Sequence, residues 1–211
     1  MKIIPQSHEI LQIPYDPCKQ IEVAARTCYK SEAKITDTSA PAMATNLIES
    51  GHHAMIEHAV MTVRFITDRG VSHELLRHRI ASYAQESSRY CNYSNKKFGN
   101  EITVINPVFW EEKTLQYNFW KISMESTEKN YFDLLRVGAT PQEARSVLPT
   151  SLKTEIVMTC NMREWRHALN LRCSNKAHPQ FSALMLPLLK ELHEKVPVLF
   201  DDIYLKYFGT D

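Results

Sequence analysis

Arginine side chains concentrate in two short windows of the sequence, residues 77–89 and 163–172, which together hold six of the eleven arginines. A guanidinium group binds a phosphate or a carboxylate through two parallel hydrogen bonds. The first window also carries hydroxyl and amide side chains and few acids that could neutralise the positive charges. Solvated helix faces with surface ion pairs are the alternative, because such pairs form readily and contribute little to stability. The clustering favours a binding site for anionic ligands.

The spacing of Arg77 and Arg79 allows two geometries. On a continuous helix the two side chains would point about 200° apart, so they would bind two ligands or two ends of one ligand. If the helix stops at Arg77 and the chain extends, alternate residues share a side and both arginines could bind one phosphate.

Glycine is scarce, with five residues in a chain of 211. The sequence contains neither the G-x-G-x-x-G turn of dinucleotide-binding folds nor the G-x-x-x-x-G-K phosphate loop. Any phosphorylated ligand must therefore be held by other groups, and the arginines are suited to that role.

The overall charge is close to neutral, with 25 Lys and Arg against 24 Asp and Glu. This balance gives no broad positive field for nucleic acid or for an anionic membrane. Tyr83, Tyr90 and Tyr93 lie between the arginines, as in single-strand binding surfaces, so an RNA-binding module is an alternative function. We expect a small pocket for a nucleotide-like ligand and no nucleic-acid partner.

The cysteines and the apolar stretches indicate the compartment. The five cysteines form no C-x-x-C pair, and no apolar stretch approaches the ~18 residues of a membrane span. We expect a cytoplasmic protein without a membrane partner. Cys18 falls early in an amphipathic pattern without an evident base, so we assign it to the core instead of to a nucleophile.

Two groups of histidines are candidate metal sites. His73 and His78 flank Glu74 as in zinc hydrolases, but they are five residues apart instead of four, which separates them by about 140° on a helix. The other group could form a metal cluster, or its members could bond carbonyls at a helix end. Its histidines are His52, His53 and His58. We predict no metal ion, and keep metal-dependent hydrolysis at the second group as an alternative.

Hydrophobic spacing and capping residues predict helices and strands in no regular alternation. Helices are expected over about a dozen residues from Pro17, then over residues 41–50, 72–77 and 109–137 (as one or two helices), from the Thr140 cap onward, and over residues 162–171 and 179–195. Strands are expected over residues 59–67, 102–105 and 155–160, and an ordered loop over residues 82–93. Gly51 and Gly138 should end helices, and Gly70 a strand. We predict an α+β fold, with mixed helices around a central, mainly antiparallel sheet in a single domain, residues 1–211.

The run R-H-R-I-A-S-Y-A-Q-E-S-S-R-Y at residues 77–90 resembles the R-H-R-x7-S signature, extended to S-x-R-Y, of the flavin-dependent thymidylate synthases. Three further segments are similar to that family in order and spacing. They are G-H-x-x-x-x-E-H at residues 51–58, A-R-x-x-L-P at residues 144–149, and N-x-R followed by L-N-L-R within residues 161–172. The resemblance covers about residues 15–200, nearly the whole chain.

The resemblance implies a homotetramer in which several subunits build each active site around FAD. The enzyme would methylate dUMP to dTMP, with 5,10-methylenetetrahydrofolate as the carbon donor and NADPH as the source of the reducing hydride, through the flavin. All four ligands carry phosphates or carboxylates, which accounts for the arginine windows.

The resemblance also assigns residues to ligands. The expected contacts of FAD are His52, Arg77, His78, Arg79, Asn161, Arg163 and His167. The expected contacts of dUMP are Glu74, Arg77, Gln85, Ser87, Arg89, Arg145 and Arg172. Arg172 is expected to act in catalysis, since a guanidinium beside the uracil can stabilise negative charge as the ring is activated for attack from C5. Ser87 is assigned to binding, because a nucleophilic serine needs an adjacent base and none is evident.

Two places depart from the family pattern. The position two residues after the histidine of the G-H segment often holds a serine or threonine in the family and is Ala54 here, which removes one hydroxyl contact. A family segment similar to A-Q-W-E is represented by Ala177-His178-Pro179-Gln180-Phe181.

Overall fold

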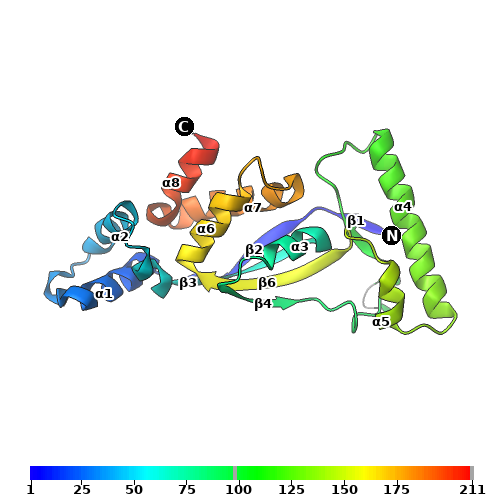
Figure 1. The fold of residues 1–211 in the computed structure, drawn as a ribbon, viewed down its shortest axis with the longest axis horizontal. Coiled ribbons are helices and arrows are strands. Elements are labelled where there is room, and N and C mark those ends of the chain that lie inside the picture. The colour runs from blue at the N-terminus through cyan, green and yellow to red at the C-terminus, as the bar shows by residue number, and fades with distance from the viewer. Residues whose placement is uncertain (97–98, 210–211) are drawn as a thin grey trace. The chain divides into compact units, whose positions relative to one another are not determined.

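The computed structural model describes residues 1–96 and 99–209 of the chain and contains both helices and strands (Figure 1). The strands are β1 (Lys2–Ile4), β2 (Ser7–Gln12), β3 (Val60–Asp68), β4 (Ala81–Gln85), β5 (Thr103–Ile105) and β6 (Lys153–Asn161). The α-helices are α1 (Pro17–Tyr29), α2 (Ser39–Glu49), α3 (Arg69–Leu75), α4 (Leu115–Arg136), α5 (Pro141–Ala144), α6 (Met162–Arg172), α7 (Pro179–Lys195) and α8 (Pro197–Phe208). Short 3₁₀ helices are η1 (Glu32–Lys34), η2 (His53–His58) and η4 (Arg145–Val147).

The strands form two sheets. One is four-stranded and mainly antiparallel, in the order β2-β3-β6-β4. The other pairs β1 with β5 in parallel, with Ile3 opposite Val104. The expected α+β class with a mainly antiparallel sheet is confirmed.

By its internal contacts the chain divides into two compact units, each assembled from three segments of the sequence. The first unit consists of the described residues of Met1–Ser7, Phe65–Arg77 and Ala84–Ile156. The second consists of the described residues of His8–Arg64, His78–Tyr83 and Val157–Asp211. Strands β2, β3, β4 and β6 each contribute residues to both units. That residues 1–211 act as one domain stays a prediction.

The first unit has an aromatic and aliphatic core around α4. The core residues are Tyr93, Ile102, Val104, Met124, Tyr131, Ala144 and Leu152. The N-terminal ammonium group of Met1 is tied to this unit by ion pairs with Glu128 at 2.9 Å and Glu101 at 3.3 Å. Residues 109–137 contain one long helix, α4, whose first turn is capped by the Thr114 hydroxyl.

The second unit is mainly helical. In Figure 1, α1 lies beside α2, and α7 lies beside α8, in agreement with the contacts between these helices. The start of α1 is as expected, because Oδ1 of Asp16 accepts a hydrogen bond from the backbone N–H of Lys19 at 2.9 Å and Pro17 takes the first helical position. Cys18 is buried on this helix, which confirms its assignment to the core.

Gly51 and Gly138 have φ angles of +74° and +99°, which confirms that each follows the end of a helix in a left-handed conformation. The expectation for Gly70 is wrong, because this residue lies inside α3. Oδ1 of Asp68 caps α3 by accepting a hydrogen bond from the N–H of Val71 at 2.7 Å, so the helix does not start at Ser72. A Cβ on Gly70 would lie 3.1 Å from that capping oxygen, so glycine makes room for the cap.

The expectation of a loop over residues 82–93 is wrong at its start, because Ala81–Gln85 forms the edge strand β4 beside β6. The polar side chains that suggested a loop are compatible with a strand that is paired on one side only. The strands β1 and β2, the helix α8 and the short 3₁₀ helices η1 and η2 were not anticipated either. Helix α8 is well packed, with Leu199, Phe200 and Ile203 buried. No helix in the described part of the chain is long and apolar enough to span a bilayer.

Candidate functional site

Helix α6 begins directly after β6 and carries the second arginine window. Oδ1 of Asn161 caps the helix by accepting a hydrogen bond from the N–H of Glu164 at 2.9 Å. The apolar face of α6 is buried, and Nε1 of Trp165 donates to the carbonyl of Met61 at 3.1 Å. Arg163 and His167, one helical turn apart, are exposed on another face. The local sequence thus fixes the direction in which these two side chains point.

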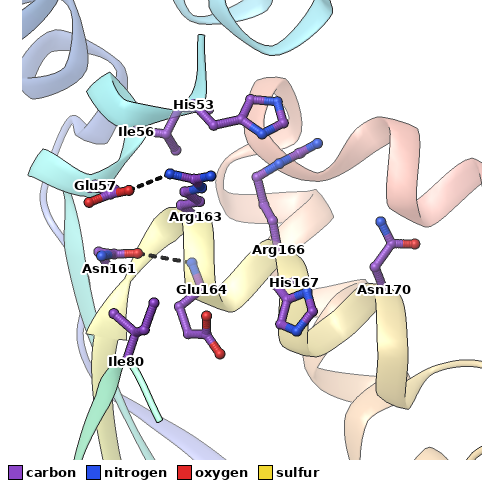
Figure 2. Close-up of a pocket in the computed structure, with 10 residues that line it drawn as sticks. All are labelled: His53, Ile56, Glu57, Ile80, Asn161, Arg163, Glu164, Arg166, His167 and Asn170. Atoms are coloured by element: carbon purple, nitrogen blue, oxygen red, sulfur yellow. Dashed lines mark hydrogen bonds and ion pairs between the residues drawn. The ribbon is translucent and has the colours of Figure 1, made fainter. Parts of the chain in front are cut away.

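A cavity of about 510 Å³ lies at this face of α6, within the second unit (Figure 2). Its volume is in the range of ligand pockets. Its walls come from η2, from Ile80 directly before β4, from the end of β6 and from α6. The lining residues are His53, Ile56, Glu57, Ile80, Asn161, Arg163, Glu164, Arg166, His167 and Asn170.

The cavity is suited to an anionic group. The N-terminus of α6 opens onto it, and the first backbone N–H groups of a helix and its dipole favour negative charge. Arg163 lies beside that terminus and forms a 2.6 Å ion pair with Glu57, a partner that is itself half-exposed (Figure 2). An exposed pair of this kind contributes little to stability, so a phosphate can replace the carboxylate at low cost. The donor set fits the pyrophosphate of a dinucleotide such as FAD.

Arg166 has a structural role within the second unit. It is buried, its two terminal nitrogens donate to the carboxylate of Asp202 at 2.8 Å and 2.6 Å, and it also donates to the carbonyl of Leu199. Burial raises the pKa of Asp202, but the hydrogen bond and charge of Arg166, together with two backbone hydrogen bonds, outweigh it, and the net pKa is lowered. Arg166 therefore forms a buried structural ion pair, which differs from the surface ion pairs of the alternative, although it also lines the cavity.

A chain of hydrogen bonds connects three side chains of the second unit. Nδ1 of His78 lies 3.1 Å from Oε1 of Glu164, and Nε of Arg172 donates to Nε2 of His78 at 3.1 Å. The guanidinium carbon of Arg172 also lies 4.8 Å from the centre of the Phe181 ring. The positive charge of Arg172 is thereby held from two sides.

The charge state of His78 follows from its surroundings. The ring is buried, and burial lowers its pKa; the hydrogen bond with Glu164 opposes this shift, and the positive charge of Arg172 lowers the pKa further. Because a guanidinium can only donate, Nε2 of His78 must accept, and the ring is neutral in this arrangement.

His78 and two neighbours form the one group among the described residues that could hold a metal ion. The possible ligand atoms of His78, Glu164 and His167 lie within 4.8 Å of one another. The charge of Arg172 opposes a cation here, and its N–H occupies the lone pair of Nε2. We keep the prediction of no metal. In the other histidine group, His53 lies 3.3 Å from the carbonyl of Ile48, which favours the alternative of carbonyl bonding at a helix end.

Most of the residues expected to contact dUMP belong to the first unit. The side-chain nitrogen of Gln85 donates to Ser72 at 2.9 Å and to Thr154 at 3.2 Å, so its amide has a fixed orientation. Oγ of Ser87 accepts from the N–H of Arg89 at 3.3 Å. A terminal nitrogen of Arg145 lies 3.5 Å from Oγ of Ser88, which brings Arg145 to the turn that carries Ser87 and Arg89.

The residues expected to contact FAD and those expected to contact dUMP belong mostly to different units. Every expected FAD contact except Arg77 lies in the second unit, and every expected dUMP contact except Arg172 lies in the first. Of the expected FAD contacts, Asn161, Arg163 and His167 line one cavity. Glu164 lines the same cavity and is hydrogen-bonded to His78.

The other residues expected to contact FAD or dUMP do not line the cavity. His52 is exposed and does not line the cavity, where its neighbour His53 does. Arg77, Arg79 and Arg89 are exposed, and Glu74 is half-buried on α3. Helix α3 ends at Leu75, so a continuous helix through Arg77 and Arg79 is excluded.

The tyrosines between the arginines do not form a stacking surface. Tyr93 is buried, and the hydroxyl of Tyr83 donates to the carbonyl of His78 at 2.7 Å, while Tyr90 is exposed. These positions argue against a single-strand binding module, which needs several exposed rings.

Two residues that line the cavity, Glu164 and Glu57, were not among the expected ligand contacts. Glu164 lies inside the N-x-R segment and is 86 residues from His78 along the chain, so only the fold reveals their contact. Glu57 belongs to the G-H segment, and its partner Arg163 is 106 residues away. The two departures from the family pattern also have defined positions. Ala54 is exposed in η2, and the segment from His178 to Phe181 starts α7, with His178 as the cap of that helix.

Known proteins resemble this chain in sequence and in fold. A family model described as "Thymidylate synthase complementing protein" matches residues 9–198. A flavin-dependent thymidylate synthase of Geobacter sulfurreducens is 32% identical over 200 residues, which cover 92% of this chain and 84% of that protein. Another, from Corynebacterium aurimucosum, is 35% identical over 204 residues, 88% of this chain and 79% of that protein. The crystal structure of a UMP/dUMP methylase from Streptomyces cacaoi, bound with 5-Br dUMP, matches 99% of this chain and 98% of its own, with a TM-score of 0.79 and 22% identity, and so supports the fold.

Proposed function

Since the chain belongs to the family of flavin-dependent thymidylate synthases, we propose that it methylates dUMP to dTMP. The carbon unit comes from 5,10-methylenetetrahydrofolate and the reducing hydride from NADPH, with FAD as the bound cofactor. Bound FAD supplies the hydride-transfer chemistry that converts the transferred methylene into a methyl group. The cytoplasm, where these small molecules are made and used, is the expected compartment.

One observation carries this proposal: Glu164 lines the cavity suited to an anionic cofactor and also bonds His78, which bonds Arg172. The candidate flavin site and the candidate catalytic arginine thus share a residue in one unit. Arg163, Asn161 and the N-terminus of α6 would hold the FAD pyrophosphate.

The resemblance also assigns the remaining contacts of the FAD site. The side chains that would complete it are His52, Arg77, His78, Arg79 and His167. The dUMP contacts, proposed from the same resemblance, are Glu74, Arg77, Gln85, Ser87, Arg89, Arg145 and Arg172. The arginines among them are suited to the phosphate of dUMP, because a guanidinium fork matches phosphate oxygens.

Arg172 is the proposed catalytic residue. Attack from C5 of the uracil develops negative charge on the ring, and a preoriented positive group lowers the free energy of that state. The bond to His78 and the stacking on Phe181 hold the guanidinium before substrate binds, so little reorganisation is needed when the charge develops. Ser87 takes part in binding only, since the described contacts of its hydroxyl include no base.

A homotetramer with shared active sites is part of the proposal. Helix α4 supports it, because Leu115, Phe119 and Ile122 are 71%, 70% and 61% exposed and recur at helical spacing on one face. Exposed apolar stripes of this kind mark interaction surfaces, and a second copy of the chain is the occupant that the proposal requires. Sedimentation analysis should give four chains per particle.

A titration tests the proposed function. Purified protein is mixed with FAD, and NADPH oxidation is followed before and after dUMP is added. We expect FAD to bind and the oxidation rate to rise with dUMP. Protein that binds no FAD and oxidises no NADPH contradicts the proposal. Salt-sensitive oligonucleotide binding that dUMP does not displace would instead support the RNA-binding alternative.

A further inference from the structure

Glu164, His78 and Arg172 form a directional chain of hydrogen bonds within the second unit. The guanidinium of Arg172 has only donors, so its Nε–H must donate to Nε2 of His78, and Nε2 must lack a proton. The proton of the neutral ring then sits on Nδ1, which lies 3.1 Å from Oε1 of Glu164. A carboxylate is an acceptor, so each bond fixes the direction of the next.

The three side chains are shielded to different degrees. His78 is 3% exposed and Glu164 is 8% exposed, whereas Arg172 is intermediate. An acceptor at Nε2 therefore lies inside the protein, and the arginine that it binds reaches outward. Two further groups contact His78. The centre of the His167 ring lies 5.8 Å from the centre of the His78 ring, edge to face, and the Tyr83 hydroxyl donates a hydrogen bond to the backbone carbonyl of His78.

We propose that Glu164 is a positioning residue, which holds His78 in the Nδ1–H tautomer so that Nε2 anchors the guanidinium of Arg172. With the opposite tautomer, Nε2–H would face Nε–H of Arg172, two donors would meet, and the arginine would lose its anchor. The role of the anchored arginine rests on the proposed function. The tautomer of His78 does not depend on the proposed function, so the tautomer and the catalytic role of Arg172 are tested by separate measurements.

The histidine tautomer is measured directly by ¹⁵N NMR of protein labelled in its histidines, with the His78→Gln variant used to assign the signal. In the wild type, Nδ1 of His78 should carry the proton and Nε2 should not. In Glu164→Met, which has no acceptor at this position, the signal of the Nδ1–H tautomer should be lost or mixed. Glu164→Gln keeps a carbonyl acceptor and should retain the tautomer. Glu191→Met is the matched control, because it removes another glutamate and histidine pair, His8 with Glu191 at 2.9 Å.

Turnover gives a second readout. In Glu164→Met we expect kcat, measured at saturating FAD, to fall about 10- to 100-fold, as for other residues that orient a working side chain, while KM for dUMP changes little. Glu164 raises the pKa of His78, so its removal should also move the acid limb of the kcat profile to lower pH. A protonated Nε2 in the wild type overturns the proposal, even if Glu164→Met fails to fold. So do an unchanged tautomer and kcat in Glu164→Met, or stoichiometric zinc bound by His78 and Glu164.

Discussion

The Nε–H of Arg172 donates a hydrogen bond to Nε2 of His78, and the two nitrogens lie 3.1 Å apart. His78 is buried at the start of the segment that leads into β4, and Arg172 is the last residue of α6. A buried histidine therefore fixes one side of an arginine that reaches outward. This relationship explains how a mobile side chain can be held ready for the charge that develops on a substrate.

Replacing Arg172 by alanine should reduce kcat by about 10²- to 10³-fold, the usual cost of removing one group that stabilises a transition-state charge. The FAD content of the purified protein should change little, because the cavity does not include this side chain. Arg172→Lys should not restore kcat, since lysine lacks the Nε–H that bonds His78. Equal losses of turnover and FAD content would show that our division of roles is wrong.

Replacing Arg163 by alanine should weaken FAD binding by about 10-fold or more, since a hydrogen bond to a charged group is worth roughly 1.5–3 kcal/mol. Arg64→Ala is the matched control, because Arg64 also pairs with a glutamate, Glu9, and does not line the cavity. Fluorescence titration with FAD measures both variants. Equal dissociation constants for the two would contradict a flavin site at α6.

Arg166 and Arg163 should differ in their effects on stability. Arg166→Ala leaves the carbonyl of Leu199 and the Asp202 carboxylate without their partner, and should lower the free energy of unfolding by about 1–3 kcal/mol. Arg163→Ala should stay within about 0.5 kcal/mol, because its ion pair is half-exposed. Urea denaturation of the FAD-free proteins compares them without ligand stabilisation. The reverse order would refute these assignments.

The cysteines should differ in reactivity. Burial raises the pKa of the Cys18 thiol to about 11, with a smaller contribution from Asp16, whereas Cys28 is exposed. The thiolate is the reactive form and accumulates as pH rises through the pKa. Iodoacetamide at about pH 8 should therefore modify Cys28 and spare Cys18, and labelling of Cys18 should increase only toward pH 11. Peptide mass spectrometry after labelling distinguishes the two sites. Equal labelling at the lower pH would contradict the core assignment.

Local signals in the sequence predicted many of the elements. Asp16 and Pro17 start α1, Gly51 follows α2, and the alternation of residues 59–67 marks β3, because each of these signals acts over a few residues. Strand β4 was missed because it overlaps the polar run that begins at Ser82, and because its pairing with β6 depends on residues far away in the chain. Helix α8 was missed although Pro197 occupies its first turn.

For the candidate site too, the sequence indicated individual residues but not their long-range contacts. Residue types and motif spacing identified Arg163, His78 and Arg172, since these belong to segments that resemble a known family. The hydrogen-bond partners could not be identified, because Glu164 and His78 are separated by 86 residues and meet only in the folded chain. The structural role of Arg166 was likewise hidden, since Asp202 lies on a helix that the sequence analysis did not predict.

The most direct test of the account is the identity of the product. Protein loaded with FAD is incubated with dUMP, NADPH and 5,10-methylenetetrahydrofolate labelled in its methylene carbon, and the nucleotides are separated and analysed by mass spectrometry. We predict dTMP with the label in its methyl group, formed in step with NADPH oxidation and abolished when dUMP is omitted. Protein that binds FAD but forms no labelled dTMP would contradict the central claim.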